Sequence, residues 1–302
     1  MEVFSRIVAL FIVLVVGAIT GKIGIVSSEF RRDLSQFLVK IALPMFLFNS
    51  MISGQGTQDI GSGLPMILLC FGIYGSAIIL ATILSKFWPV SELKKPSYTF
   101  AMVFPNMGFL GLPVLEAALG AQGVFYGAFY ILFVDVILWT YGVYLFRGNS
   151  GGKIRLKQMI TPSIAAILLA LVFLILNIKL PEMVLLPIGL LGSLSPPLSM
   201  VILGLLLSEM ELKEIVDGPA AIFTVLYRLV FFPLATYGVL SFLNFSSYYL
   251  YVPVIVMAMP VAAIGAVQAS SYGKEYKSIT GLIVLSTMLS LITIPMIIKI
   301  IM

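Results

Sequence analysis

Apolar residues run through this chain in long blocks, and short stretches between the blocks carry most of the charged residues. Blocks of roughly twenty apolar residues have the length that an α-helix needs to cross a lipid bilayer. Strict alternation of apolar and polar residues, the pattern of an outer-membrane barrel, is absent. The pattern predicts an all-α polytopic membrane protein with about ten spans, near residues 3–21, 34–52, 63–86, 97–119, 122–146, 160–178, 183–208, 219–243, 250–272 and 278–301.

One expected span, 97–119, contains residues that a simple membrane helix would not favour. Its segment "FPNMGFLGLP" (104–113) holds two prolines, two glycines and an asparagine. Proline removes a backbone donor and clashes with the preceding turn, so the helix should open near Pro105, and span 250–272 should open near Pro260. Irregular backbone at membrane depth is tolerated only where protein buries it or where it lines a water-filled cavity.

The two halves of the chain resemble each other weakly around these prolines. "AMVFPNMGFLG" (101–111) aligns with "VMAMPVAAIGA" (256–266), which places Pro105 against Pro260. The offset is roughly 150 residues, or five spans, and because five is odd the second copy would enter the membrane from the opposite side. We therefore expect two inverted five-helix repeats, 1–150 and 151–302, with broken helices 4 and 9 crossing. Such repeats are typical of secondary transporters.

The side chains around the two breaks favour an organic anion over a bare cation. Neither aligned segment contains Asp or Glu, which a cation exchanger would use to bind its ion. Asn106 can donate two hydrogen bonds to a carboxylate, and glycine lets a ligand approach the backbone closely. Gln268, about two turns beyond the second proline, can reach the same cavity. The expected substrate-binding residues are Asn106, Pro105, Gly108, Gly111, Pro260, Val261 and Gln268. The alternative is a proline kink with small residues that aid helix packing, and an interhelical hydrogen bond from the asparagine.

Three charged residues lie inside expected spans: Lys40, Asp135 and Arg228. Intramembrane charges are costly and usually face a partner or a cavity. Asp135 and Arg228 have compatible depths, so they form either a structural ion pair or a functional pair, in which Arg228 binds a substrate carboxylate or Asp135 carries a coupling proton. Lys40 either reaches the cytoplasmic interface with its long side chain or acts at the boundary between two moving parts.

The basic loop residues are distributed unequally between the two sides of the expected membrane. Cytoplasmic loops are enriched in Lys and Arg, so the richer side should be cytoplasmic, with both termini outside. The richer side carries Lys22, Arg31, Arg32, Lys86, Lys94, Lys95, Arg147, Lys153, Arg155, Lys157, Lys213, Lys274 and Lys277, and the other side carries Arg6, Lys179 and Lys299. This asymmetry accounts for the sequence pI of about 9.2 without nucleic acid as a partner.

Composition narrows the chemistry further. The 302 residues are 60% hydrophobic and only 10% charged, with one cysteine, Cys70, and no histidine. The commonest metal ligand and general base is therefore missing, and one thiol makes neither an internal disulfide nor a metal site. We expect no enzyme, no cofactor and no metal.

Five segments together resemble the auxin efflux carrier family, which includes the plant PIN auxin exporters and bacterial malate or malonate permease-like proteins. They are "FPNMGFLGLPV" (104–114), "SPPLSMVILGLLLS" (195–208), "YRLVFFPL" (227–234), "MPVAAIGAVQASSYG" (259–273) and "IVLSTMLSLITIPMI" (283–297). The resemblance implies a fold like that of bile-acid sodium symporters and sodium/proton antiporters. Spans 1, 2, 6 and 7 would form a scaffold and a homodimer, and spans 3–5 and 8–10 a transport domain that moves like an elevator. Asn106 matches the family's asparagine beside the crossover.

The leading hypothesis is thus a secondary transporter or facilitator of small organic anions in the cytoplasmic membrane, with the lipid bilayer around it. One alternative is a sodium- or proton-coupled symporter of bile-acid-like substrates, for which Gln268, Ser270 and Ser271 offer few polar ligands. An alternative of another class is a membrane sensor that binds a partner and transports nothing.

Overall fold

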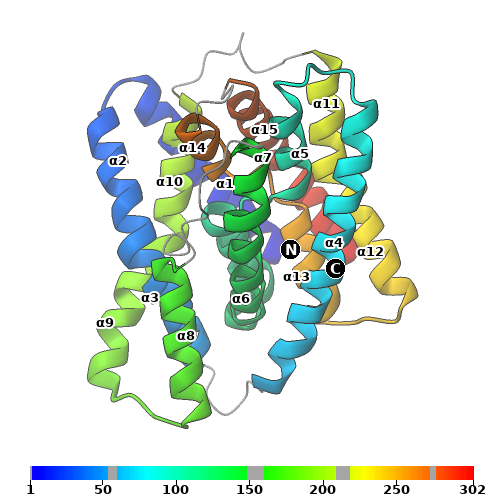
Figure 1. Cartoon of the computed structure of the whole chain (residues 1–302). Helices are drawn as coiled ribbons and strands as arrows, with labels where there is room; N and C mark the ends of the chain where they lie inside the picture. Colours follow the sequence, from blue (N-terminus) through cyan, green and yellow to red (C-terminus); the bar gives the residue numbers. More distant parts are fainter. Residues whose placement is uncertain (1, 54–59, 148–159, 209–217, 273–276) are drawn as a thin grey trace. The chain divides into compact units, whose positions relative to one another are not determined.

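The computed structural model describes residues 2–53, 60–147, 160–208, 218–272 and 277–302, and these are almost entirely helical (Figure 1). One isolated β-bridge is their only pairing of extended backbone. The helices are α1 (Glu2–Lys22), α2 (Ser28–Phe37), η1 (Leu38–Ala42), α3 (Leu43–Ile52), η2 (Ile60–Ser62), α4 (Gly63–Phe87), α5 (Lys95–Val103), η3 (Met107–Gly111), α6 (Leu112–Ile137), η4 (Leu138–Gly142), α7 (Val143–Arg147), α8 (Pro162–Ile175), α9 (Glu182–Ser193), α10 (Ser195–Ser208), α11 (Pro219–Leu226), η7 (Tyr227–Phe231), α12 (Phe232–Phe242), α13 (Tyr248–Met257), α14 (Ile264–Ser271) and α15 (Lys277–Ile301).

Seven helical stretches among the described residues are long and apolar enough to cross a membrane: Val3–Lys22, Ser28–Ile52, Gly63–Phe87, Met107–Arg147, Glu182–Ser208, Pro219–Phe242 and Lys277–Ile301. Two shorter apolar helices are Pro162–Ile175 and Tyr248–Met257. The prediction of an all-helical membrane protein is confirmed. The count of ten spans and the inverted repeat of 1–150 and 151–302 stay predictions.

The expected spans 97–119 and 122–146 differ from the observed elements. The first is divided at residues 104–106, and its second part continues with the next span through Met107–Arg147, 41 residues. Gly120 interrupts this stretch with φ 67° and ψ −161°, a conformation that glycine adopts without a Cβ clash. The boundary that hydropathy placed at 119–122 therefore coincides with a non-helical residue inside α6.

Four π-helical segments interrupt spans in the described part of the chain, and three of them share a sequence cause. Pro44, Pro113 and Pro233 each stand two residues after such a segment, η1, η3 and η7 respectively. Proline has no N–H for the carbonyl four residues earlier and its ring clashes with that carbonyl, so the preceding turn widens. The N–H of Leu43 accordingly bonds to Leu38 O, and that of Phe232 to Tyr227 O, both five residues back. The fourth segment, η4, has no such proline.

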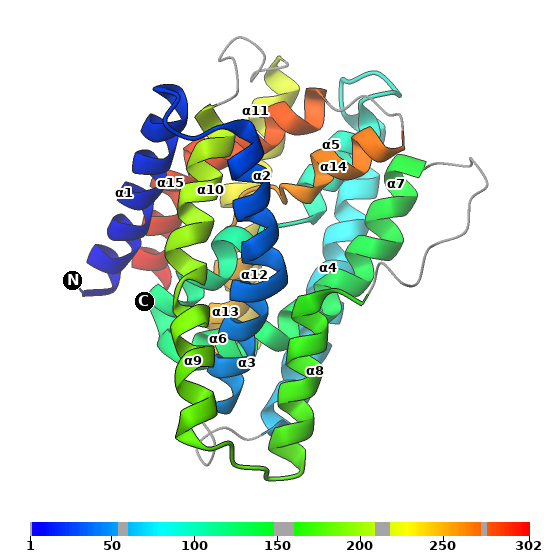
Figure 2. The ribbon, with the colours of Figure 1, turned by 90° about the vertical axis from the view of Figure 1, so that its left-hand side faces the viewer.

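The chain divides into two compact units. Unit 1 comprises residues 1–67, 108–132 and 157–209. Within it α1 runs along α10 (Figure 2), and α3 packs against α8 and α9. Glycine permits the close contact between α1 and α10. A Cβ at Gly17 would meet the carbonyl oxygen of Val201, and a Cβ at Gly204 would meet the carbonyl oxygen of Leu14.

Unit 2 comprises residues 68–107, 133–156 and 210–302. Within it α12 packs on α13, α5 contacts α7, α11, α14 and α15, and α15 also contacts α13 and α14. The boundaries between the units fall inside α4, after Ile67, and inside α6, after Leu132. Unit 2 holds both broken segments that the prolines predicted.

This division can be compared with the scaffold and transport domain that the family resemblance implies. Spans 1, 2, 6 and 7 fall in unit 1, while spans 8–10 and most of span 3 fall in unit 2. Spans 4 and 5 are shared between the units, which the expected assignment did not anticipate. Five basic residues of the loops that the sequence predicts to be cytoplasmic lie outside the described residues: Lys153, Arg155, Lys157, Lys213 and Lys274.

Candidate functional site

Both predicted helix breaks are present in unit 2. Helix α5 ends at Val103 and helical structure resumes at Met107, while α13 ends at Met257 and α14 begins at Ile264. Each break contains the expected proline, Pro105 or Pro260, and both prolines are buried. The sequence therefore located these two interruptions correctly.

The two broken segments are hydrogen-bonded to each other as a short antiparallel bridge between Pro105 and Val261. The N–H of Asn106 donates to Pro260 O at 2.7 Å, and the N–H of Ala262 donates to Phe104 O at 3.0 Å. These bonds satisfy backbone groups that the helix breaks release, as an interior without water requires. We call residues 104–106 and 260–262 the crossing.

Arg228 lies beside the crossing and is completely buried. Its Nε donates to Met259 O at 3.2 Å, and its Nη1 lies 3.3 Å from Met102 O and 3.4 Å from Val103 O. Met102 and Val103 are the last residues of α5, and Met259 follows the end of α13. The guanidinium therefore caps carbonyls at the C-terminal ends of both half-helices.

This contact places a positive charge beside the C-terminal ends of the two half-helices. A helix carries roughly half a negative charge at its C-terminus and half a positive charge at its N-terminus. Without Arg228, the C-termini of α5 and α13 would offset the N-terminal end of α14. The positive charge of Arg228, bonded to these carbonyls, offsets their negative ends.

A serine on α15 completes the hydrogen bonding of the crossing. Ser286 is fully buried, and its Oγ accepts the N–H of Val261 at 3.0 Å and donates to Ile283 O at 3.0 Å. Sequence reasoning missed this role, although Ser286 lies in one of the segments that resemble the family. The available signal was a serine in the middle of an apolar helix.

Gln268, on α14, is 3% exposed. In the part of the chain that the structure describes, neither its Nε2 nor its Oε1 has a hydrogen-bond partner. Its Oε1 lies beside Gly142 of η4, at 3.4 Å from where a Cβ on that glycine would stand. A buried amide without partners costs free energy and calls for an explanation such as a ligand or water. The π-helical η4 is a second unusual feature here, since π-bulges occur frequently at functional sites.

The other sequence-predicted residues are placed as follows. Asn106 is 3% exposed and lies in the crossing, as Val261 does. Gly108 and Gly111 follow in η3, which after Met107 belongs to unit 1, so the structure divides the predicted set between the two units. Asp135 is half-buried in α6.

Asp135 and Arg228 each interact electrostatically with the buried Tyr74. The predicted ion pair between these two residues stays a prediction. Lys40 is exposed in η1 and donates to Gln36 Oε1 at 2.9 Å, an environment consistent with a side chain that reaches the interface.

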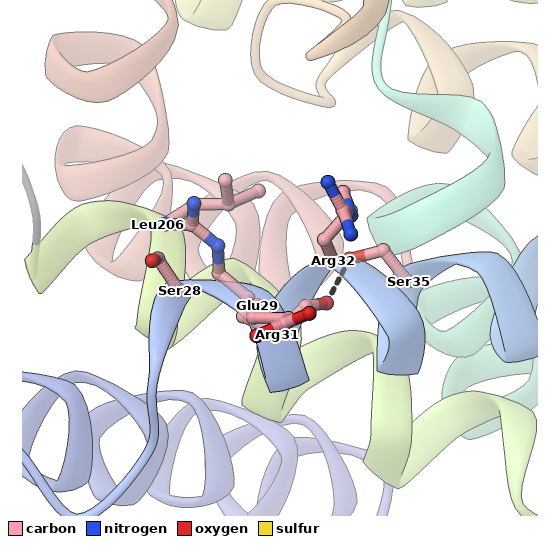
Figure 3. A pocket seen from close by; sticks show the side chains of 6 residues that line it. All are labelled: Ser28, Glu29, Arg31, Arg32, Ser35 and Leu206. Carbon is pink, nitrogen blue, oxygen red and sulfur yellow. Dashed lines mark hydrogen bonds between the residues drawn. The ribbon is translucent and has the colours of Figure 1, made fainter.

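Unit 1 has a separate cavity of about 510 Å³ at the start of α2, lined by Ser28, Glu29, Arg31, Arg32, Ser35 and Leu206 (Figure 3). Ser35 Oγ donates to Arg31 O at 2.9 Å, and Arg32 forms an exposed ion pair with Asp33 at 3.8 Å. The sequence predicted a cytoplasmic loop around Arg31 and Arg32, but the structure places these residues in α2. None of the predicted substrate-binding residues lines the cavity.

Comparison with known proteins finds a matching family and several similar proteins. The family described as "Membrane transport protein" matches residues 2–155 and 149–298. An uncharacterized transporter of Methanothermobacter thermautotrophicus is 26% identical over 303 residues, covering 97% of this chain and 96% of that protein. An uncharacterized transporter of Methanocaldococcus jannaschii is 27% identical over 301 residues, covering 96% of each. An uncharacterized transporter of Saccharomyces cerevisiae is 26% identical over 111 residues, 37% of this chain and 17% of that protein.

The family match covers nearly the whole chain, including both broken segments and Arg228. The two archaeal relatives extend over the same length. The chain therefore belongs to this membrane transport protein family, the auxin efflux carrier family.

Proposed function

We propose that this protein is a secondary transporter or facilitator of small organic anions, and that the crossing in unit 2 binds the carboxylate. The observation that carries the proposal is the capping of two half-helix C-termini by Arg228. Half-helix N-termini at a membrane-buried break bind anionic groups of a substrate, while C-terminal ends attract cations. Arg228 satisfies the C-terminal ends, so an anion is the ligand that the remaining field favours.

Two buried amide side chains of unit 2, one in the crossing and one on α14, support the same ligand. Asn106 and Gln268 are buried amides, and the amide of Gln268 lacks a partner among the described residues. An amide can donate two hydrogen bonds to a carboxylate and accept from a hydroxyl group of the same substrate. Segments 101–111 and 256–266 contain no Asp or Glu that would repel the substrate.

The mechanism that suits this arrangement is movement of unit 2 as the transport domain, with α1, α3, α8, α9 and α10 of unit 1 as the scaffold. The division into two compact units supports this mechanism. The protein would act in the cytoplasmic membrane, with both termini outside, as a homodimer through its scaffold helices. In an elevator mechanism of this kind, the transport domain moves across the bilayer as a rigid body and its binding site stays intact.

Proton coupling is the alternative that one observation favours. Asp135 is a half-buried carboxylate inside a span, and Tyr74 interacts electrostatically with both Asp135 and Arg228. Intramembrane carboxylates of transporters commonly carry protons. In this version Asp135 takes up the coupling proton, while the crossing still binds an organic anion.

Uptake into proteoliposomes and thermal shift of the purified protein test the proposal, with mono- and dicarboxylates as probes. We expect at least one carboxylate to raise the melting temperature of the wild type. Gln268→Leu and Asn106→Ala should weaken its apparent affinity about tenfold or more, because each removes a hydrogen bond to a charged group. Gln36→Leu is the matched control, since Gln36 is an exposed amide in unit 1, and it should bind like the wild type.

Two results would count against the site: no carboxylate stabilises the wild type, or the Gln268→Leu and Asn106→Ala variants both bind as well as the wild type does. Uptake into proteoliposomes also tests whether transport is coupled to protons. If Asp135 takes up the coupling proton, Asp135→Asn should flatten the pH dependence of uptake, and an unchanged pH profile would exclude that role for Asp135.

A further inference from the structure

The charge of Arg228 has a consequence for ion coupling. In transporters with broken helices, unwound carbonyls and half-helix C-terminal ends are the groups that coordinate a coupling cation. Here the guanidinium of Arg228 bonds to carbonyl oxygens of this kind, those of Met102, Val103 and Met259. We propose that Arg228 occupies the place of the coupling cation, as a cation built into the chain, so that the crossing is held together without sodium.

The charge balance supports this assignment. The C-termini of α5 and α13 each contribute about half a negative charge, together about one elementary charge. One guanidinium balances that charge and is always protonated. A sodium ion at the same carbonyls would meet a fixed positive charge at close range in a low-dielectric interior, where repulsion is strong.

The two broken segments offer few groups that could bind a second cation. Segments 101–111 and 256–266 contain no carboxylate. The hydroxyl of Ser286, which could ligate sodium, accepts the N–H of Val261. Arg228 itself lies in η7, the π-helical segment two residues before Pro233.

The assignment predicts that removal of the guanidinium creates a need for a cation. Arg228→Met keeps an unbranched apolar side chain as far as the position of Nε but removes the guanidinium that donates to the carbonyls of both half-helices. Arg228→Lys keeps the charge with a single donating centre. Arg32→Met is the matched control, since it also removes one positive charge but from an exposed site.

Thermal unfolding of the purified full-length protein in nanodiscs, in sodium, potassium or choline chloride at equal ionic strength, measures this need. For the wild type, Arg228→Lys and Arg32→Met, the melting temperature of each protein should be the same in all three salts. Arg228→Met should melt about 5 °C or more below the wild type in choline. Added sodium or guanidinium ion should restore part of that loss, with saturation.

A saturable rise in the melting temperature of the wild type with sodium but not choline would overturn the proposal. So would an Arg228→Met protein that melts like the wild type or responds to neither cation. If Arg228→Met cannot be recovered folded, the sodium titrations of the wild type and Arg228→Lys still test the proposal. Stabilisation of either protein by sodium contradicts it. The proposal rests on the proposed function only in taking the crossing as the transport site. Because no substrate is present, failure to find a transported carboxylate would leave this result standing.

Discussion

At the scale of single residues, the crossing depends on one serine of α15 that accepts a hydrogen bond from the crossing. Ser286 supplies the acceptor for the N–H of Val261, while Ser290, equally buried on the same helix, bonds only to Thr287 O one turn earlier. Ser286→Ala should cost about 1–3 kcal/mol of stability, because it leaves a buried N–H unsatisfied. Ser290→Ala should change stability by about 0.5 kcal/mol or less.

Thermal melting of both variants, with carboxylate uptake as a second measurement, tests this difference. We expect Ser286→Ala to lower both the melting temperature and the uptake, and Ser290→Ala to retain both. Equal behaviour of the two variants would show that the bond to Val261 does not support the crossing.

The individual roles at the crossing were only partly predictable. Local rules were sufficient for Pro105 and Pro260, because proline disrupts a helix wherever it lies in the interior. The partners of Arg228 were not predictable, because they are backbone carbonyls more than a hundred residues away in one case and about thirty in the other. Sequence patterns contain no signal for a hydrogen bond to a distant backbone carbonyl. Asp135, the expected partner, was inferred from depth alone.

At the scale of elements, close contact of α1 with α10 depends on glycine. A Cβ at Gly204 would meet backbone atoms of α1, those of Leu14, Gly17 and Ala18, which cannot rotate away. Gly204→Leu should therefore separate the two helices and cost about 1–3 kcal/mol or more. Gly72→Leu on α4 is the control, because no atom lies within 4 Å of an added Cβ there.

We expect the melting temperature to fall for Gly204→Leu and to stay constant or rise slightly for Gly72→Leu, since leucine favours a helix more than glycine does. An unchanged melting temperature for Gly204→Leu would show that the α1–α10 contact is not tight in the membrane.

Helix boundaries show the same division between local and distant causes. Hydropathy located most spans within a few residues, because the bilayer fixes the length of a spanning helix. It did not predict the π-helical segments, although a proline two residues after η1, η3 and η7 is a local signal for them. The segment η4 beside Gln268 has no such proline, so this local signal does not account for it.

At the scale of the whole molecule, orientation in the membrane is the property that the sequence predicts and that labelling can measure. In a Cys70→Ser background, single cysteines replace Glu92, Lys179 or Ser246, which are exposed residues of three connections. The distribution of basic residues places Glu92 inside and the other two outside. An impermeant maleimide should therefore label Lys179→Cys and Ser246→Cys on intact cells, but Glu92→Cys only after permeabilisation.

Lys179→Cys is the most informative of the three, because it reports whether α8 crosses the bilayer. Pro162–Ile175 has 14 residues, a length of about 21 Å at helical rise, against a hydrocarbon core of about 30 Å. If α8 crosses, with its flanking residues completing the span, Lys179 lies opposite Glu92. If α8 does not cross, Lys179→Cys will label only after permeabilisation, as Glu92→Cys does. That result would remove one of the ten spans, and five spans in each repeat would no longer be possible.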